Sequence, residues 1–178
     1  MIETRRLVLI PASVESLSAE TARDYARFAA ALGVAEPELW PPELYDDDAI
    51  AFSLQALRSG AHASHWRTYY LALKRPRVLI GAGGYVGAPD AEGGVEIGYS
   101  ILPAHRRKRY ASEATAAFVA HAFKDASIRR VVAHTYPDLV GSIGVLKRNR
   151  FKLVGPGEHE GTLRFVRERR FLPLRPAN

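Results

Sequence analysis

The 178-residue sequence contains no cysteine. This absence excludes disulfide bonds, thiolate nucleophiles, and zinc or iron–sulfur sites with cysteine ligands. The sequence also has no run that approaches the ~18 consecutive apolar residues of a membrane-spanning helix. Its first six residues, Met-Ile-Glu-Thr-Arg-Arg, carry charges where a signal peptide requires an apolar segment. We therefore expect a cytoplasmic protein with no membrane as a partner.

The remaining composition is that of a globular protein, with 47% hydrophobic and 25% charged residues. A chain of this length can bury about 70% of the surface that its unfolded form exposes. Neither a repeat nor a low-complexity segment interrupts it. The sequence therefore predicts a single domain over residues 1–178.

Charge is distributed unevenly along the chain. Residues 1–102 contain nine Lys and Arg against 13 Asp and Glu, a net charge of −4. Residues 103–178 contain 16 against six, a net charge of +10. A basic half indicates either an anionic partner, such as nucleic acid, anionic lipid or a phosphorylated cofactor, or a solvated face without a partner.

Apolar periodicity and turn residues predict alternating helices and strands. Ser13 is expected to cap a helix that ends at Gly33, and a second helix is expected to begin at Asp46 and to end at Gly60. Two further helices are expected over residues 112–126 and 142–149. Strands are expected over residues 5–10, 68–73, 78–86, 95–102, 130–136, 151–154 and 162–171. This order predicts an α+β fold around a mixed sheet.

The segment that begins at residue 95 is the most informative for chemistry. A strand leads into a tight turn with four consecutive cations and then directly into a helix; the cations are Arg106, Arg107, Lys108 and Arg109. The first N–H groups of a helix lack partners, and the helix dipole adds partial positive charge, so such a turn favours anions. No dinucleotide fingerprint and no Walker-type glycine motif is present. The segment is therefore either a phosphate or pyrophosphate site or a solvated basic loop.

The same segment resembles a known motif. Pro-x-x-Arg-x-x-x-Tyr-Ala-Ser-Glu-Ala, which begins at Pro103 after Glu-Ile-Gly-Tyr, resembles the acetyl-CoA loop of the GNAT superfamily of N-acetyltransferases. Residues 133–138, 142–151, 3–7 and 40–42 are similar to the branch that acetylates the N-termini of ribosomal proteins. The resemblance implies the GNAT fold, whose central sheet is mixed, mostly antiparallel and flanked by helices. It also implies acetyl-CoA as cofactor and acetyl transfer to a primary amine by direct attack in a ternary complex.

The resemblance assigns acetyl-CoA binding to the end of the strand, the basic turn, the start of the following helix and one residue of the last helix. These residues are Ile101, Arg106, Arg107, Lys108, Arg109, Tyr110, Ala111, Ser112 and Ser142. Three residues depart from the family pattern. Arg109 stands where glycine is usual, Leu139 replaces an asparagine, and Arg150 replaces a glycine at the end of the last helix, where a positive φ is common.

Acetyl transfer needs a group that takes a proton from the ammonium and an acid for the leaving CoA thiolate. Many relatives use a tyrosine of the last helix as the acid, and the matching residue here is Leu146. Ser142 matches a serine that has this role in the ribosomal-protein branch, although a plain helix N-cap is the alternative. Glu96 is expected to act as base or ammonium binder, with a structural pairing to a neighbouring Arg or Tyr as the alternative.

Four residues are expected to contact the acceptor: Trp40, Tyr45, Glu96 and His134. The acidic segment over residues 36–48 would suit a cationic amine, whether a protein N-terminus or a small molecule. The histidines show no spacing typical of metal ligands, so no metal site is expected. Two other functions stay open, a catalytically silent acyl-CoA-binding module and, less favoured, a nucleic-acid-binding protein. A homodimer is compatible with the sequence.

Overall fold

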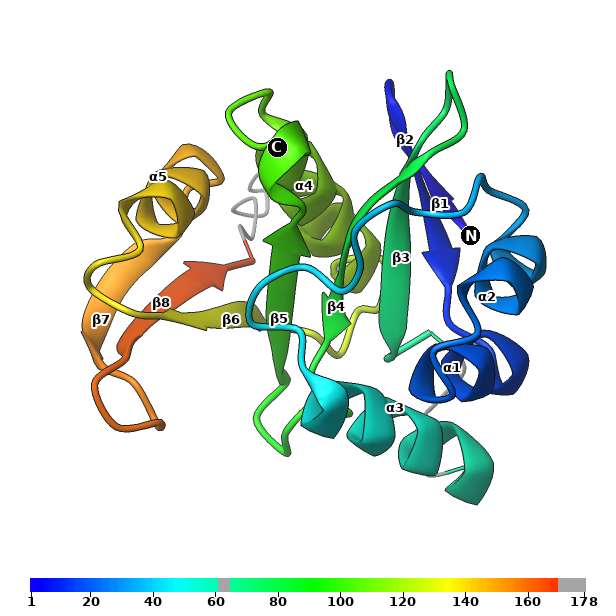
Figure 1. Cartoon of the computed structure of the whole chain (residues 1–178). Helices are drawn as coiled ribbons and strands as arrows, with labels where there is room; N and C mark the ends of the chain where they lie inside the picture. The colour runs from blue at the N-terminus through cyan, green and yellow to red at the C-terminus, as the bar shows by residue number, and fades with distance from the viewer. Residues whose placement is uncertain (61–64, 170–178) are drawn as a thin grey trace, which may run out of the picture.

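The computed structural model describes residues 1–60 and 65–169. Within them, eight strands form one sheet in the order β1-β2-β3-β4-β5-β6-β8-β7 (Figure 1). The strands are β1 (Ile2–Glu3), β2 (Leu7–Pro11), β3 (Thr68–Leu73), β4 (Leu79–Tyr85), β5 (Gly94–Ile101), β6 (Arg130–Thr135), β7 (Lys152–Pro156) and β8 (Leu163–Glu168). The helices are α1 (Val14–Thr21), α2 (Tyr25–Leu32), α3 (Asp47–Ser59), α4 (Tyr110–Ala122) and α5 (Val140–Arg148), with the short 3-10 helix η1 (Pro103–His105) between β5 and α4.

Strand pairing confirms the expected fold class. The neighbouring strands pair antiparallel, with the exception of β5 and β6, which pair in parallel. The result is a mixed, mostly antiparallel sheet with helices on both faces, as expected of an α+β protein.

Each face of the sheet has its own core. On one face, α4 buries Phe118 against Ile97 of β5. On the other, α1, α2 and α3 pack over Tyr70 of β3, with Phe28 completely buried. We call these the α4 face and the α1–α3 face. Side chains alternate along a strand, so Ile97, Tyr99 and Ile101 of β5 share one face, whereas Glu96, Gly98 and Ser100 share the other.

The single helix expected between Ser13 and Gly33 is wrong, because the structure contains two shorter helices. α1 begins at the predicted cap, where the Ser13 hydroxyl accepts the N–H of the third helical residue. After α1, Arg23 adopts a left-handed conformation with a φ of 56°. Asp24 then caps α2 by accepting the N–H of Arg27 at 3.0 Å. The break lets the two helices pack against each other instead of forming one rod.

The other elements begin and end near their expected positions. α3 begins after Asp46, which accepts the N–H of Ala49, and it ends at Gly60 with a φ of 67°. β1 was not expected, because a two-residue strand carries no alternating pattern. The final strand ends at Glu168, and residues 170 and 171 of the expected strand lie outside the described residues.

β5 and β6 diverge after a short pairing. Their register covers three residue pairs, from Gly94 with Arg130 to Glu96 with Val132, whereas β5 continues to Ile101. Among the described residues, no strand pairs with this edge of β5 beyond Glu96. Figure 1 shows β6 leading away from β5 toward α5, β7 and β8. The unpaired backbone groups of the β5 edge are therefore available to a ligand.

In the described part of the chain, no helix combines the length and the apolar character needed to cross a bilayer.

Candidate active site

The basic turn over residues 106–109 connects η1 to α4, and all four of its cationic side chains are exposed. Arg107 and Arg109 adopt left-handed conformations, with φ values of 61° and 65°. This conformation explains why glycine suits position 109. Arg109 is also the N-cap of α4, where no side chain caps the helix. The turn thus combines positive charge with the N–H groups of a helix start, which is the arrangement that binds anions.

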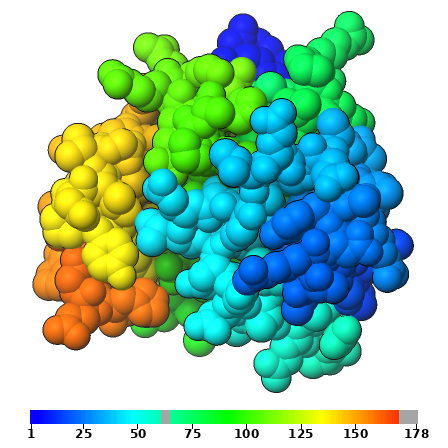
Figure 2. Space-filling view, in the orientation of Figure 1, coloured from blue at the N-terminus to red at the C-terminus, as the bar shows by residue number. Residues whose placement is uncertain are grey.

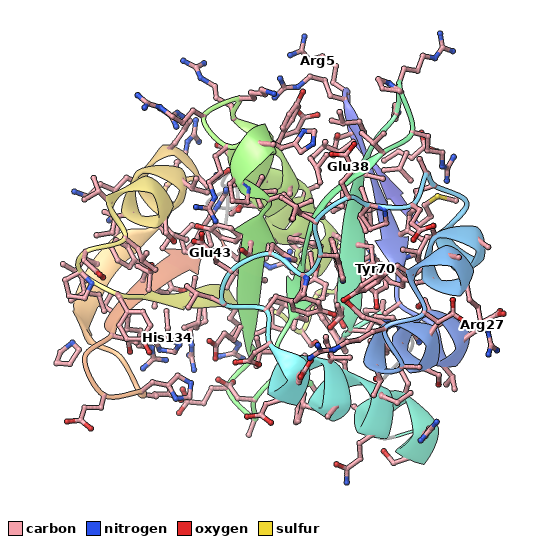
Figure 3. The ribbon with its side chains drawn as sticks, viewed as in Figure 1. Arg5, Arg27, Glu38, Glu43, Tyr70 and His134 are labelled. Carbon is pink, nitrogen blue, oxygen red and sulfur yellow. The ribbon has the colours of Figure 1, made fainter. Side chains whose placement is uncertain are left out.

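Arg106 is held by protein groups on two sides. Its Nε donates to the backbone carbonyl of Ile101 at 2.9 Å, and its Nη2 donates to Oε2 of Glu43 at 2.9 Å. Figure 3 shows Glu43 on the segment that crosses in front of β5. Lys108 donates from Nζ to the carbonyl of Ala104 at 3.0 Å. Arg106 therefore connects the basic turn to the segment over residues 40–46.

Three expected cofactor residues direct their side chains into the fold. The Tyr110 ring lies beneath the guanidinium of Arg6, 4.4 Å from Cζ to the ring centroid. Ala111 packs against the core of the α4 face. Buried Ser112 accepts a hydrogen bond from Nδ2 of Asn149 at 3.1 Å, which ties α4 to the end of α5. A ligand at the turn would therefore meet their backbone N–H groups rather than these side chains.

Ser142 lies in the first turn of α5, because this helix begins at Val140 and has Leu139 as its N-cap. The N-cap alternative for Ser142 is therefore wrong. The Ser142 Oγ lies 3.2 Å from the hydroxyl of Tyr99, which projects from β5. Burial raises the pKa of Tyr99 to about 12, against an opposing effect of the hydrogen bond to Ser142. Tyr99 therefore stays neutral near pH 7 and retains a proton to donate.

Tyr99 was not among the expected site residues. Strand alternation could have indicated its face, which it shares with Ile97, but not that α5 would lie beside it. Leu146, at the position where many relatives carry a tyrosine, is completely buried in the core. The hydroxyls of Ser142 and Tyr99 therefore form a pair at the first turn of α5, where Leu146 has no hydroxyl to offer.

Glu96 and His134 form a hydrogen-bonded pair on neighbouring strands. The Oε1 of Glu96 lies 2.8 Å from Nδ1 of His134, and their side chains are 25% and 5% exposed. The alternative that paired Glu96 with a neighbouring Arg or Tyr is therefore wrong, since its partner is His134, and two expected site residues lie together. The Nε2 of His134 is buried and has no hydrogen-bond partner among the described residues. Figure 3 labels His134, which belongs to β6. A carboxylate beside an imidazole can accept a proton and pass it on.

Trp40 and Tyr45 hold their segment against α1 through a buried carboxylate. Glu20 accepts hydrogen bonds from Nε1 of Trp40 at 2.6 Å and from the hydroxyls of Tyr70 at 2.5 Å and Tyr45 at 3.3 Å. Burial raises the pKa of Glu20, although these three hydrogen bonds oppose the rise. Both expected acceptor residues therefore have a structural role, and only Tyr45 also lines the cavity described next.

A cavity of about 360 Å³ lies beside β5 on the α1–α3 face. Its floor comes from β3, β4 and β5, and its walls come from α3 and neighbouring loops. Figure 2 shows the cyan surface of residues near 45–55 over this face. Glu96 points to the same face of β5 two residues before Gly98, and its carboxylate is turned to His134 of β6. The lining residues are Leu44, Tyr45, Ala49, Phe52, Ser53, Thr68, Ala82, Gly83, Gly84, Tyr85, Val86, Gly98, Tyr99 and Ser100.

Comparison with known proteins gives a consistent result. Residues 16–152 match the family described as acetyltransferase (GNAT) domain. A protein of Bacillus subtilis (strain 168), named uncharacterized N-acetyltransferase YjdG, is 27% identical over 153 residues, which are 86% of this chain and 90% of that protein.

Two solved structures have the same fold. An acetyltransferase (GNAT family) from Bacillus anthracis has a TM-score of 0.62 at 19% identity, covering 94% of this chain and 97% of its own. RimL, a ribosomal L7/L12 alpha-N-protein acetyltransferase solved in complex with coenzyme A, has a TM-score of 0.64 at 17% identity, covering 93% and 95%. At these identities the structures support the fold.

Proposed function

This chain belongs to the GNAT acetyltransferase family, and we propose that it transfers the acetyl group of acetyl-CoA to a primary amine by direct attack in a ternary complex. One observation carries the proposal. Within the part of the chain that the structure describes, one edge of β5 is unpaired beyond Glu96, and β5 leads through η1 to a basic turn at the start of α4. An extended ligand with amide groups and phosphates would satisfy both features at once.

Acetyl-CoA has the chemistry that these features favour. The amide groups of its pantetheine arm can hydrogen-bond to the β5 edge between Ile97 and Ile101 as a strand would. Its phosphates suit the charge of Arg107, Lys108 and Arg109, together with the first N–H groups of α4. Bound acetyl-CoA supplies an activated acetyl thioester, and the protein positions the amine beside it.

The proposed proton acceptor and proton donor belong to opposite faces of β5. Glu96, with His134 behind it, points to the face that holds the cavity, and it takes the proton that the attacking amine loses. The hydroxyl pair of Tyr99 and Ser142 is on the α4 face, and it gives a proton to the sulfur as the carbon–sulfur bond breaks. The new bond joins the amine nitrogen to the acetyl carbon. Separation of the two pairs keeps acid and base from neutralising each other.

Charge reversal in the turn tests acetyl-CoA binding. We expect the double substitution Arg107→Glu with Lys108→Glu to weaken calorimetric affinity at least about tenfold, because charge-assisted contacts are lost. The matched control is Arg75→Glu with Arg77→Glu, which changes net charge equally in the exposed turn between β3 and β4. Equal weakening in both double variants, or no binding of the native protein at millimolar acetyl-CoA, would contradict the assignment.

Turnover separates the proposed enzyme from a silent binding module. The assay follows release of the CoA thiol from acetyl-CoA with a panel of primary amines, against the rate without amine. We expect amine-dependent release together with one equivalent of acetylated amine. Tight acetyl-CoA binding without amine-dependent release across the panel would support the silent module instead.

A further inference from the structure

The cavity beside β5 is apolar, and we propose that it holds the acceptor: a primary amine carried on an apolar, ring-sized group, of the arylalkylamine type. The inference rests on the proposed function, because it names the acceptor class for the same site. The volume of about 360 Å³ lies at the lower end of the about 300–1,000 Å³ typical of small-molecule sites. A ring with a short amine-bearing chain is of this size class.

Charge distribution favours a single ammonium group. Among the residues that the structure describes, no charged side chain lines the cavity. Two acidic side chains of the neighbouring segment face other cations, since Glu43 pairs with Arg106 at 2.9 Å and Asp47 with Arg23 at 3.3 Å. A polyamine would bury several ammonium groups without carboxylate partners, which is costly. Glu96, which points to this face of β5 two residues before Gly98, is outside the lining and offers one carboxylate to one amine.

The hydroxyl groups of the cavity are already hydrogen-bonded within the protein. The Ser53 Oγ donates to the Ala49 carbonyl and lies 2.8 Å from the Thr68 Oγ1. The Ser100 Oγ donates to the Glu43 carbonyl at 2.5 Å. The Tyr45 hydroxyl donates to Glu20. The hydroxyls of Tyr85 and Tyr99 are turned to the opposite face of the sheet, where they contact the Phe118 carbonyl and Ser142. The cavity therefore offers little to a polar ligand and much apolar surface to a ring.

Small side chains leave the floor of the cavity flat. Ala82 and Gly84 of β4 lie opposite Ser100 and Gly98 of β5. A Cβ added at Gly98 would meet only the Val86 Cγ2, at 3.9 Å, so the space above this residue is open. An open, flat floor between apolar walls suits the face of a planar ring.

Large apolar side chains are exposed around the cavity. Leu44, Phe52 and Val86 are 72%, 53% and 53% exposed, and all three line it. Exposed apolar residues scattered singly are ordinary, whereas their gathering around a concave site indicates binding. Phe52 also has a matched control, because Leu153 of β7 is likewise 53% exposed and does not line the cavity.

The experiment compares 2-phenylethylamine, spermidine and ethanolamine as acceptors, and measures binding of each amine to the protein saturated with CoA. We expect kcat/KM for 2-phenylethylamine to exceed that for the other two at least about tenfold. Phe52→Ala and Gly98→Val should each lower it about tenfold or more, the first by removing a wall and the second by filling the floor. Leu153→Ala should leave kcat/KM unchanged, and acetyl-CoA affinity should stay constant in Phe52→Ala and Leu153→Ala.

The outcomes separate this inference from the proposed function. Acetyl transfer that prefers spermidine or ethanolamine, or that is equally sensitive to Leu153→Ala, overturns the inference and leaves the acetyltransferase intact. Binding of 2-phenylethylamine that Gly98→Val weakens, without turnover, supports the inference and contradicts the proposed function. Absence of both turnover and binding overturns the inference too. A further experiment uses a peptide amide with N-terminal phenylalanine as acceptor. Faster acetyl transfer to this peptide than to 2-phenylethylamine supports an acceptor amine on an aromatic group and identifies that acceptor as a polypeptide.

Discussion

Replacing Arg109 with glycine tests whether the backbone or the side chain of the turn binds phosphate. Arg109 has φ 65° and ψ 15°, in the left-handed region. In this region the strain of a residue with a Cβ lowers the stability of the folded protein by about 1–2 kcal/mol. Glycine removes this strain but lowers the free energy of unfolding by about 0.4–1 kcal/mol, because it gives the unfolded chain more conformational freedom. We expect Arg109→Gly to raise the free energy of unfolding by about 0.5–1 kcal/mol, measured by urea denaturation.

Acetyl-CoA affinity is the second measurement on this variant. If the N–H groups of the turn bind the phosphates, removal of the Cβ leaves the affinity unchanged or raises it, since nothing obstructs the backbone. A loss of more than about tenfold, with weaker salt dependence, would refute this reasoning and assign the contact to the Arg109 guanidinium.

Arg150 provides the control, because it is also an exposed arginine with a φ of 64°. It follows the end of α5 and lies outside the basic turn. Arg150→Gly should show a similar gain in stability with no change in acetyl-CoA affinity. If both variants changed the affinity equally, the effect at Arg109 would not be local to the turn.

Four further predictions concern catalysis and stability. Tyr99→Phe and Ser142→Ala should each lower kcat about 10²-fold or more at unchanged acetyl-CoA affinity, because the pair supplies the thiolate proton; native kcat in both variants would contradict this role. Glu96→Gln should remove the acidic limb of the pH profile of kcat/KM, since an amide cannot take the ammonium proton, and a higher KM with the limb unchanged would mean that Glu96 only binds the amine. Glu20→Ala should lower the free energy of unfolding by about 2–5 kcal/mol, because half-buried Trp40 and buried Tyr70 lose the acceptor of their hydrogen bonds; a loss under about 1 kcal/mol would refute this. Because burial raises the pKa of Glu20, the folded protein binds a proton at this carboxyl group more tightly than the unfolded protein does. The stabilisation that comes from this protonation is therefore present at low pH and is lost as pH rises through the raised pKa. Glu20→Gln should flatten that part of the curve of melting temperature against pH, and an unchanged curve would contradict the assignment.

The basic turn could be predicted because its information is local. The run of cations, the preceding strand and the following helix are adjacent in sequence, and the unusual residue at position 109 falls where the backbone is left-handed. The caps at Ser13 and Asp46 were predicted for the same reason. In contrast, the break at Arg23 carries no glycine or proline to mark it, and it depends on how α1 and α2 pack.

The hydrogen-bonded pairs of the site could not be predicted from the sequence. Glu96 and His134 are 38 residues apart, and Tyr99 and Ser142 are 43 residues apart, so their contacts depend on how β6 and α5 lie beside β5. Residue types suggested that Glu96 and Ser142 were reactive but could not identify their partners. The cavity could be predicted still less, because residues far apart in the sequence line it, from β3, β4, β5, α3 and the loops between them.

The contact between Glu43 and Arg106 is one of several ion pairs that join the acidic and basic halves of the sequence. The residue that matches the phosphate-loop arginine of the family also fixes Glu43, whose neighbours Leu44 and Tyr45 line the cavity. The Ser100 hydroxyl donates to the backbone carbonyl of Glu43, so β5 and the basic turn both bind Glu43 beside the cavity wall. A ligand that draws the Arg106 guanidinium toward phosphate must therefore compete with Glu43 or share the cation with it. Under the proposed function, the basic turn and the cavity are two adjoining half-sites, one for an anion and one for an acceptor, and Arg106 connects them through Glu43.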